Sequence, residues 1–125
     1  MVKTLISMVC VFLLLTFGAI YETNFVQKQF NEFHDVLTEL YQKVDEQTAV
    51  EDDVYAVQKN WLDKKRVLHI FIPHNEIKEV DLWLSEAVTL IKNQDYKEAL
   101  YKIEVTINLI EQISKTFSFR IENIL

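Results

Sequence analysis

The residues best suited to chemistry lie between Trp61 and Trp83, in the stretch WLDKKRVLHIFIPHNEIKEVDLW. Two histidines, His69 and His74, stand here on either side of Pro73, the only proline of the chain. Imidazole nitrogens bind zinc and carry protons, so this pair is the first candidate for a metal or catalytic site. On a continuous helix, however, a spacing of five residues points two side chains about 140° apart, and Pro73 is expected to break the helix between them in any case. We therefore expect no metal site here, and a solvated or capping role for each imidazole.

The other reactive side chains form no recognisable catalytic arrangement. Ser85, Ser114 and Ser118 follow no glycine-containing turn of the kind that presents a nucleophilic serine, and no histidine is near them in sequence. The acidic cluster at 51–53 lacks the alternating oxygen ligands and the glycine turn of a calcium loop. We therefore expect no enzyme and no cofactor.

Composition limits both the fold and the partners. The chain has one Gly and one Pro, which is too few for a sandwich, a barrel or a nucleotide-binding loop, so helices are expected throughout. The net charge is −6, whereas a general nucleic-acid binder needs clustered Lys and Arg to displace counterions from phosphates. We expect no nucleic acid among the partners.

The chain begins with an apolar segment, which precedes all of the candidate residues. From Thr4 to Tyr21 the sequence has no charged residue, and a helix of this length spans about 27 Å, close to the roughly 30 Å of a bilayer's hydrocarbon core. The segment predicts a membrane anchor over residues 1–21, followed by a second domain over residues 22–125. A cleaved signal peptide is the alternative, although the exit TFGA is a poor cleavage site.

Charges flanking the segment predict its orientation. Lys3 precedes it and Glu22 follows it, so the short tail is expected in the cytoplasm and the bulk of the chain outside the cell membrane. Cys10, the only cysteine, lies within the apolar run. The exported part therefore has no disulfide available, and packing alone must hold its core.

Residues 22–125 are expected to fold as a bundle of three or four helices. The first helix continues directly out of the anchor, and apolar residues spaced by four and three positions mark one face of it. These residues are Val26, Phe30, Phe33, Leu37, Leu40 and Val44. This stripe is either one face of the bundle core or a surface for a partner, in which case Phe30, Phe33, Leu37 and Leu40 are the residues to test.

Capping signals predict where the later helices begin and end. Thr48 and Glu51 have the spacing of a capping box and predict the start of the second helix, which Pro73 is expected to end. Asn75 is expected to cap the third helix. The fourth helix is predicted at 96–113, and the terminal TFSFRIENIL as a short helical or irregular tail that packs back on the bundle.

One polar residue interrupts the apolar stripe of the second helix. Folding the second helix back on the third about the proline brings Lys64 near Glu86, so we predict a partly buried ion pair flanked by Trp61 and Trp83. The alternative is that the Lys64 side chain extends past the edge of the stripe into solvent. His74 completes the candidate residues, since it is expected to satisfy loose backbone groups at the joint.

The chain also resembles a known family. The resemblance is carried by Trp61, by the motifs HNEIKEVDLWLSEA and DYKEAL, and by the terminal FSFRIENIL, all after a single membrane segment. In these features the chain is similar to short bacterial membrane-anchored proteins known only as a domain of unknown function. The resemblance covers nearly the whole chain. It implies an exported α-helical domain from a mostly Gram-positive group, points to a multi-pass membrane protein as a partner, and brings no activity. Pro73 departs from the pattern, in which a helix-compatible residue is expected before HNE.

Two functions remain as expectations. The first is an interaction or accessory subunit at the outer face of a bacterial membrane, associated with itself or with another membrane protein. The second is an extracytoplasmic sensor-like domain that binds a small ligand or a metal. A sensor connects to a cytoplasmic output domain, and only residues 1–4 are expected on that side, so the first function is favoured.

Overall fold

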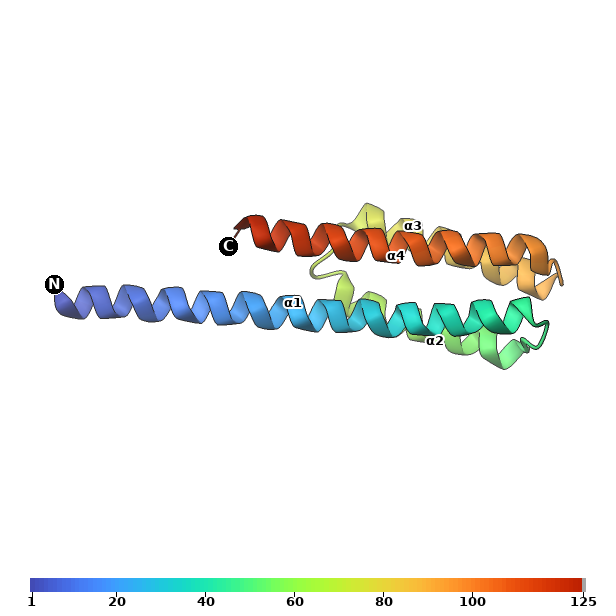
Figure 1. Cartoon of the computed structure of the whole chain (residues 1–125), viewed down its shortest axis with the longest axis horizontal. Coiled ribbons are helices and arrows are strands. Elements are labelled where there is room, and N and C mark those ends of the chain that lie inside the picture. The colour runs from blue at the N-terminus through green and yellow to red at the C-terminus, as the bar shows by residue number, and fades with distance from the viewer. Residues whose placement is uncertain (125) are drawn as a thin grey trace.

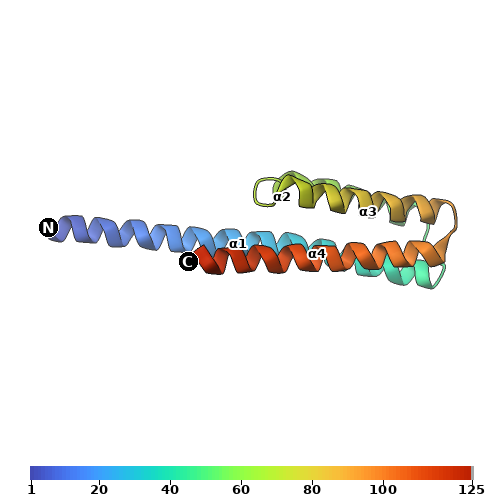
Figure 2. The same ribbon diagram turned by 90° about the horizontal axis from the view of Figure 1, so that it is seen from above.

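The computed structural model describes residues 1–124, and within them all regular structure is helical. Four helices follow one another along the chain: α1 Val2–Asp45, α2 Glu51–Leu68, α3 His74–Lys92 and α4 Tyr96–Ile124. They alternate in direction and are joined by short turns, as in an up-down-up-down bundle (Figure 1 and Figure 2). The predicted all-α class is confirmed, and the bundle has four helices.

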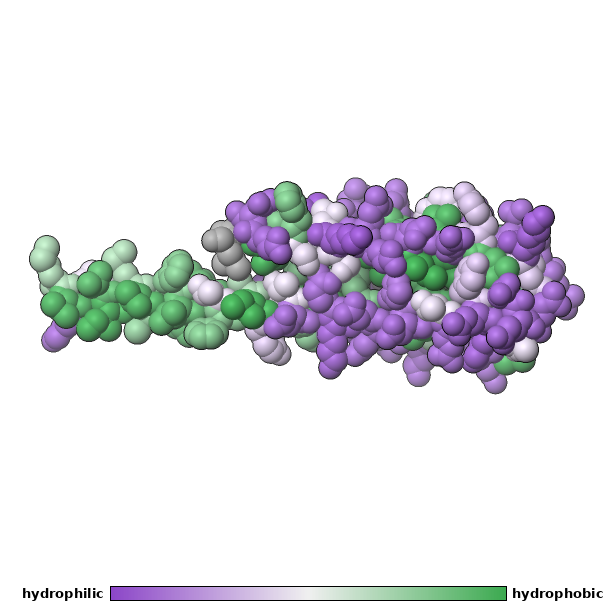
Figure 3. All heavy atoms as spheres, in the orientation of Figure 1, coloured by the Kyte–Doolittle hydropathy of each residue, from purple (hydrophilic) through white to green (hydrophobic). Residues whose placement is uncertain are grey.

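Helix α1 combines the apolar segment and one wall of the bundle in 44 uninterrupted residues. Its first part projects beyond the other helices and presents an apolar surface all round, whereas the bundle presents a mostly polar one (Figure 3). Farther along, all six residues of the predicted stripe are buried: Val26, Phe30, Phe33, Leu37, Leu40 and Val44. The stripe is therefore a face of the core, and its alternative interpretation as a free partner surface is wrong.

The other helices complete this core with their own apolar faces. The packing of α4 against both α3 and α1 is extensive, whereas α2 and α3 share a smaller interface although they are consecutive in sequence. The buried side chains of α2 and α3 are Val54, Val57, Trp61, Leu68, Ile77, Val80, Leu84, Ala87, Val88 and Ile91. Non-directional burial of these groups is the main contribution to the stability of the bundle.

The turn between α1 and α2 corrects the predicted capping box. Helix α2 begins at Glu51, and Oδ2 of Asp53 accepts a hydrogen bond from the backbone N–H of Val50 at 2.9 Å. The hydroxyl of Thr48 instead donates to the carbonyl of Lys43 at 3.3 Å. The predicted Thr48–Glu51 box is wrong because Thr48 closes the end of α1, and the carboxylate that reaches back lies two residues later.

The turn between α2 and α3 begins earlier than the proline suggests. Helix α2 ends at Leu68, and the side chain of Ile72 on the turn is buried, which fixes the path of the connection. Pro73 is the N-cap of α3 with φ −54° and ψ 141°, so Asn75 lies inside the first turn of the helix. The prediction of Asn75 as the cap is therefore wrong. Proline needs no N–H partner there and has the required φ already.

Helix α4 is longer than predicted. It does not end at Ile113 but continues to Ile124, and both Ile113 and Phe117 are buried. The apolar spacing that suggested an irregular tail is that of a helix whose other face is exposed, as Phe119 is. The tail does pack back on the bundle, and it does so as the last turns of α4.

Polar contacts fix the alignment of this extension against α1. The side-chain amide of Gln27 donates to Oγ of Ser118 at 2.7 Å and to the carbonyl of Ser114 at 3.1 Å. The helices are antiparallel, so a step of one residue toward the C-terminus of α4 corresponds to a step of one residue toward the N-terminus of α1. Asn123 therefore lies level with the turn of α1 from Gly18 to Glu22, and α4 ends beside the end of the apolar segment (Figure 1).

Candidate functional site

Trp61 is a core residue rather than a surface anchor. It is 3% exposed, and its ring stacks on Phe33 of α1 with the centroids 5.0 Å apart. Its Nε1–H donates to Oδ1 of Asp81 on α3 at 2.6 Å, and Oδ2 of Asp81 accepts from Nζ of Lys65 at 2.7 Å. Trp61 therefore joins α2 to both α1 and α3, and its indole N–H has the partner that a buried donor requires.

Lys64 pairs with α1 and not with α3. Its side chain is 12% exposed, its ammonium group contacts the carboxylate of Glu32, and it donates to Oε1 of Gln29 at 3.0 Å. The hydrogen bond from Lys64 lowers the pKa of Glu32. The predicted pair with Glu86 is wrong because the apolar stripe of α2 faces α1, and Lys64 is part of that stripe. The side chain does not extend freely into solvent either.

Glu86 and Trp83 belong to a separate cluster between α3 and α4. Oε2 of Glu86 is 3.0 Å from Nζ of Lys102, and the same ammonium lies 4.6 Å from the centroid of the Trp83 ring. This arrangement combines an ion pair with a cation–π contact at a partly exposed position. The predicted grouping of Trp61, Lys64, Trp83 and Glu86 is therefore divided among three places.

His74 lies at the α2–α3 turn, as expected, but beside His69. The two rings are stacked with centroids 5.4 Å apart and an interplanar angle of 27°. The spacing argument that separated them is wrong because α2 ends before His69, and the turn then brings His74 back. Among residues 1–124 no group of three metal-ligating side chains is gathered in one place. The role of His74 at loose backbone groups stays a prediction.

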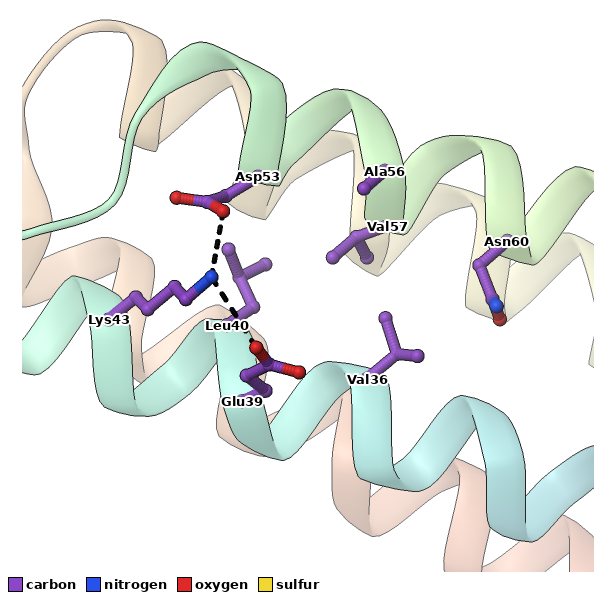
Figure 4. A pocket seen from close by; sticks show the side chains of 8 residues that line it. All are labelled: Val36, Glu39, Leu40, Lys43, Asp53, Ala56, Val57 and Asn60. Atoms are coloured by element: carbon purple, nitrogen blue, oxygen red, sulfur yellow. Dashed lines mark hydrogen bonds and ion pairs between the residues drawn. The ribbon is translucent and has the colours of Figure 1, made fainter.

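A pocket of about 190 Å³ lies between α1 and α2, toward the end of the bundle far from the apolar segment (Figure 4). This volume is below the roughly 300 to 1,000 Å³ of pockets for drug-sized ligands, so it suits a small molecule. Its walls are Val36, Leu40, Ala56 and Val57, and its polar groups are Glu39, Lys43, Asp53 and Asn60. Figure 4 shows the charged residues at one end of the pocket and Asn60 at the other.

The charged end of this pocket carries two carboxylates around one ammonium group. Nζ of Lys43 is 2.8 Å from Oδ1 of Asp53 and 3.4 Å from Oε1 of Glu39. The hydrogen bond to Asp53 raises the pKa of Lys43, and the same bond, together with the N–H of Val50, lowers the pKa of Asp53. The two carboxylates and the one ammonium group have a formal charge of −1, which favours a cationic or hydrogen-bond-donating ligand.

The amide end adds an acceptor. Oδ1 of Asn60 is buried and has no hydrogen-bond partner among the described residues. A buried acceptor that stays unsatisfied costs about 1 to 3 kcal/mol, so a donor placed in the pocket would recover stabilisation. Both ends of the pocket thus prefer the same chemistry in a ligand, namely N–H or O–H donors.

Sequence reasoning missed this pocket. Lys43 and Asp53 lie on different helices, and their meeting depends on how the turn between them folds. Asn60 left a weaker signal, since it stands three residues after Val57 and directly before Trp61, at the edge of an apolar stripe. An amide at such an edge is either solvated or aimed into a helix interface, and the sequence does not distinguish these.

The described residues therefore define a four-helix bundle built on a helix long and apolar enough to cross a membrane. A family model for a domain of unknown function, DUF4363, matches residues 19–124. The chain belongs to this family, which confirms the family resemblance found in the sequence. No curated protein and no solved structure matches the chain.

Proposed function

We propose that the protein is a single-pass membrane subunit whose bundle stands at the outer face of a bacterial membrane and binds another membrane protein. The first part of α1 carries this proposal. It is long and apolar enough to cross a bilayer, and none of its 18 most apolar consecutive residues is buried by the rest of the chain. A signal sequence has the same features, so retention in the membrane is the first point to test.

The location of the exposed apolar surface supports a partner within the membrane. The stripe at Val26–Val44 is used by the core, whereas the side chains from Leu5 to Tyr21 are largely exposed. Small residues allow close helix approach in lipid, and a Cβ added at Gly18 would meet nothing within 4 Å. The bundle itself lies outside the cell in this proposal, because Lys3 precedes the segment and Glu22 follows it.

Alkaline extraction and protease treatment test the anchor and its orientation. The full chain is expected to stay in the membrane pellet, and external protease on intact protoplasts is expected to remove the bundle. Recovery of a soluble form that begins near Ala19 would contradict the anchor. Full protection of the bundle would contradict the orientation.

Site-specific photo-crosslinking tests the partner. A photoreactive residue at each position from Phe12 to Gly18 samples the whole circumference of the helix in native membranes. We expect an adduct of defined mass at positions on one face only, and none from Tyr101, an exposed control position on α4. A complete absence of adducts from the segment would reject the partner.

A second candidate function, small-ligand binding, is favoured by the unpaired oxygen of Asn60. The pocket would take a small molecule with an amine or hydroxyl donor at each end of an apolar body. Ethylenediamine and ethanolamine are suitable probes, and a saturable rise in the melting temperature is expected. Asn60→Leu should abolish the rise, whereas Asn108→Leu at an exposed amide of α4 should preserve it. An equal rise in both variants would reject this function.

A further inference from the structure

The two ends of the bundle differ in chemistry. At the end far from the apolar segment, the turns read EQTAV at 46–50, where Val50 is 59% exposed, and NQD at 93–95. At the near end, the turn at 69–73 reads HIFIP, and Ile70 is 77% exposed. On the neighbouring α4, Phe119 is 62% exposed. Surface turns are normally polar, so exposed residues as large as Ile70 and Phe119 at the near end require an explanation.

The helix alignment places this end at the level of a membrane surface. Gln27 bonds both Ser114 and Ser118, so Phe119 is level with the turn of α1 at residues 22–26, up to about 8 Å beyond Tyr21 at 1.5 Å per residue. Each headgroup layer of a bilayer is roughly 5 to 8 Å thick. If the hydrocarbon core covers the apolar segment up to Tyr21, Phe119 therefore lies within the headgroup layer and the last turn of α4 reaches its inner boundary.

Arg120 adds a polar group suited to the same layer. Its side chain is half exposed, and its only ion pair in the described chain is a 3.8 Å contact between one guanidinium nitrogen and Glu76. The remaining N–H groups can donate to a phosphate in a bidentate manner. A phenyl ring beside a guanidinium group is the combination that amphipathic helices place at a lipid interface.

We propose that the end of the bundle formed by Ile70, Phe119 and Arg120 is seated on the lipid headgroup layer, with Arg120 bound to lipid phosphate. This end of the bundle lies level with the end of the apolar segment, and that position identifies lipid as the occupant. This proposal rests on the proposed anchor, because the same bilayer must hold residues 4–21. It gives α4 a second attachment to the membrane beside α1.

Nitroxide depth measurements test the proposal. Replacing Cys10 by alanine gives a chain without cysteine, into which Phe119→Cys, Tyr101→Cys or Leu14→Cys is introduced for spin labelling. Tyr101 is the matched control because it is on α4, is 57% exposed and lies far from the anchor. The full chain is reconstituted in vesicles of phosphatidylcholine and phosphatidylglycerol. Collision rates with lipid-soluble oxygen and with a water-soluble nickel chelate are then compared.

We expect the label at position 119 to collide several-fold less with the nickel chelate and more with oxygen than the label at position 101. Equal values at 119 and 101, with position 14 in lipid, would overturn the headgroup contact and leave the anchor intact. A water-exposed label at position 14 would overturn the anchor itself. A label at 119 that is shielded from both probes would show that another protein surface covers it, which also overturns the proposal.

Discussion

Replacing Trp61 by phenylalanine tests the hydrogen bond that joins α2 to α3. The variant keeps an aromatic ring on Phe33 and loses the Nε1–H that lies 2.6 Å from Asp81. A hydrogen bond to a charged group contributes about 1.5 to 3 kcal/mol, and we take the lower end because Asp81 is 35% exposed and keeps Lys65. The buried carbons lost with the second ring add roughly 1 kcal/mol. The free energy of unfolding should therefore fall by about 2.5 kcal/mol, from these two contributions.

Urea unfolding of the full chain in detergent micelles, followed by circular dichroism at 222 nm, measures this loss. A double-mutant cycle with Asp81→Ala should give a coupling free energy of about 1.5 kcal/mol between the two positions. Asp81→Asn, which keeps an acceptor for the indole, should cost under about 1 kcal/mol. If the effects of Trp61→Phe and Asp81→Ala instead add to within about 0.3 kcal/mol, the bond contributes nothing and the reasoning fails.

Three further predictions use the same unfolding assay. Lys43 holds the pKa of Asp53 below its ordinary value of 3.8. The contribution of this pair to the free energy of unfolding is therefore complete above that pH and is lost as the pH falls through the lowered pKa. Asp53→Asn should remove this acid-sensitive component. Phe33→Ala should lower the free energy of unfolding by about 3 to 5 kcal/mol because the ring is fully buried, whereas Phe119→Ala should lower it by under about 0.5 kcal/mol. Equal losses would contradict the assigned burial. Pro73→Ala should lower the free energy of unfolding by about 0.4 to 1 kcal/mol, because the unfolded chain gains freedom, and the helix content should not change. A loss of the helical circular-dichroism signal would contradict the role of Pro73 as the N-cap of α3.

The sequence predicted the buried face of α1 better than it predicted which helices pack together. Apolar residues from Val26 to Val44 recur at the helical period, and this local property survives in any helical packing. Lys64 was assigned correctly to the apolar stripe but wrongly to Glu86, because periodicity does not specify which helix covers the stripe. That choice depends on the packing of all four helices together, and here it brings Lys64 to Glu32.

The turns between helices were also predicted incorrectly, because their paths depend on how the helices pack together. Leu68 and Pro73 bound a connection whose path is fixed by burial of Ile72, and this burial depends on the opposing helices. The stacking of His69 on His74 follows from that path, which neither helical spacing nor the expected break at Pro73 specifies. The pocket at Asn60 was likewise beyond the sequence, since it is a gap between side chains of two helices.

The unbroken course of α1 has a mechanical consequence. No proline and no irregular turn separates its apolar segment from its bundle wall, so the helix acts as a rigid lever pivoting near Glu22. From Glu22 to Asp45 the lever arm is about 35 Å at 1.5 Å per residue. If the apolar segment is anchored as proposed, a change of about 10° in its tilt would carry the far turn sideways by roughly 6 Å, given the helical rise. In the proposed arrangement, tilting of the segment in lipid would be passed to the far end of the bundle, where the pocket between α1 and α2 lies.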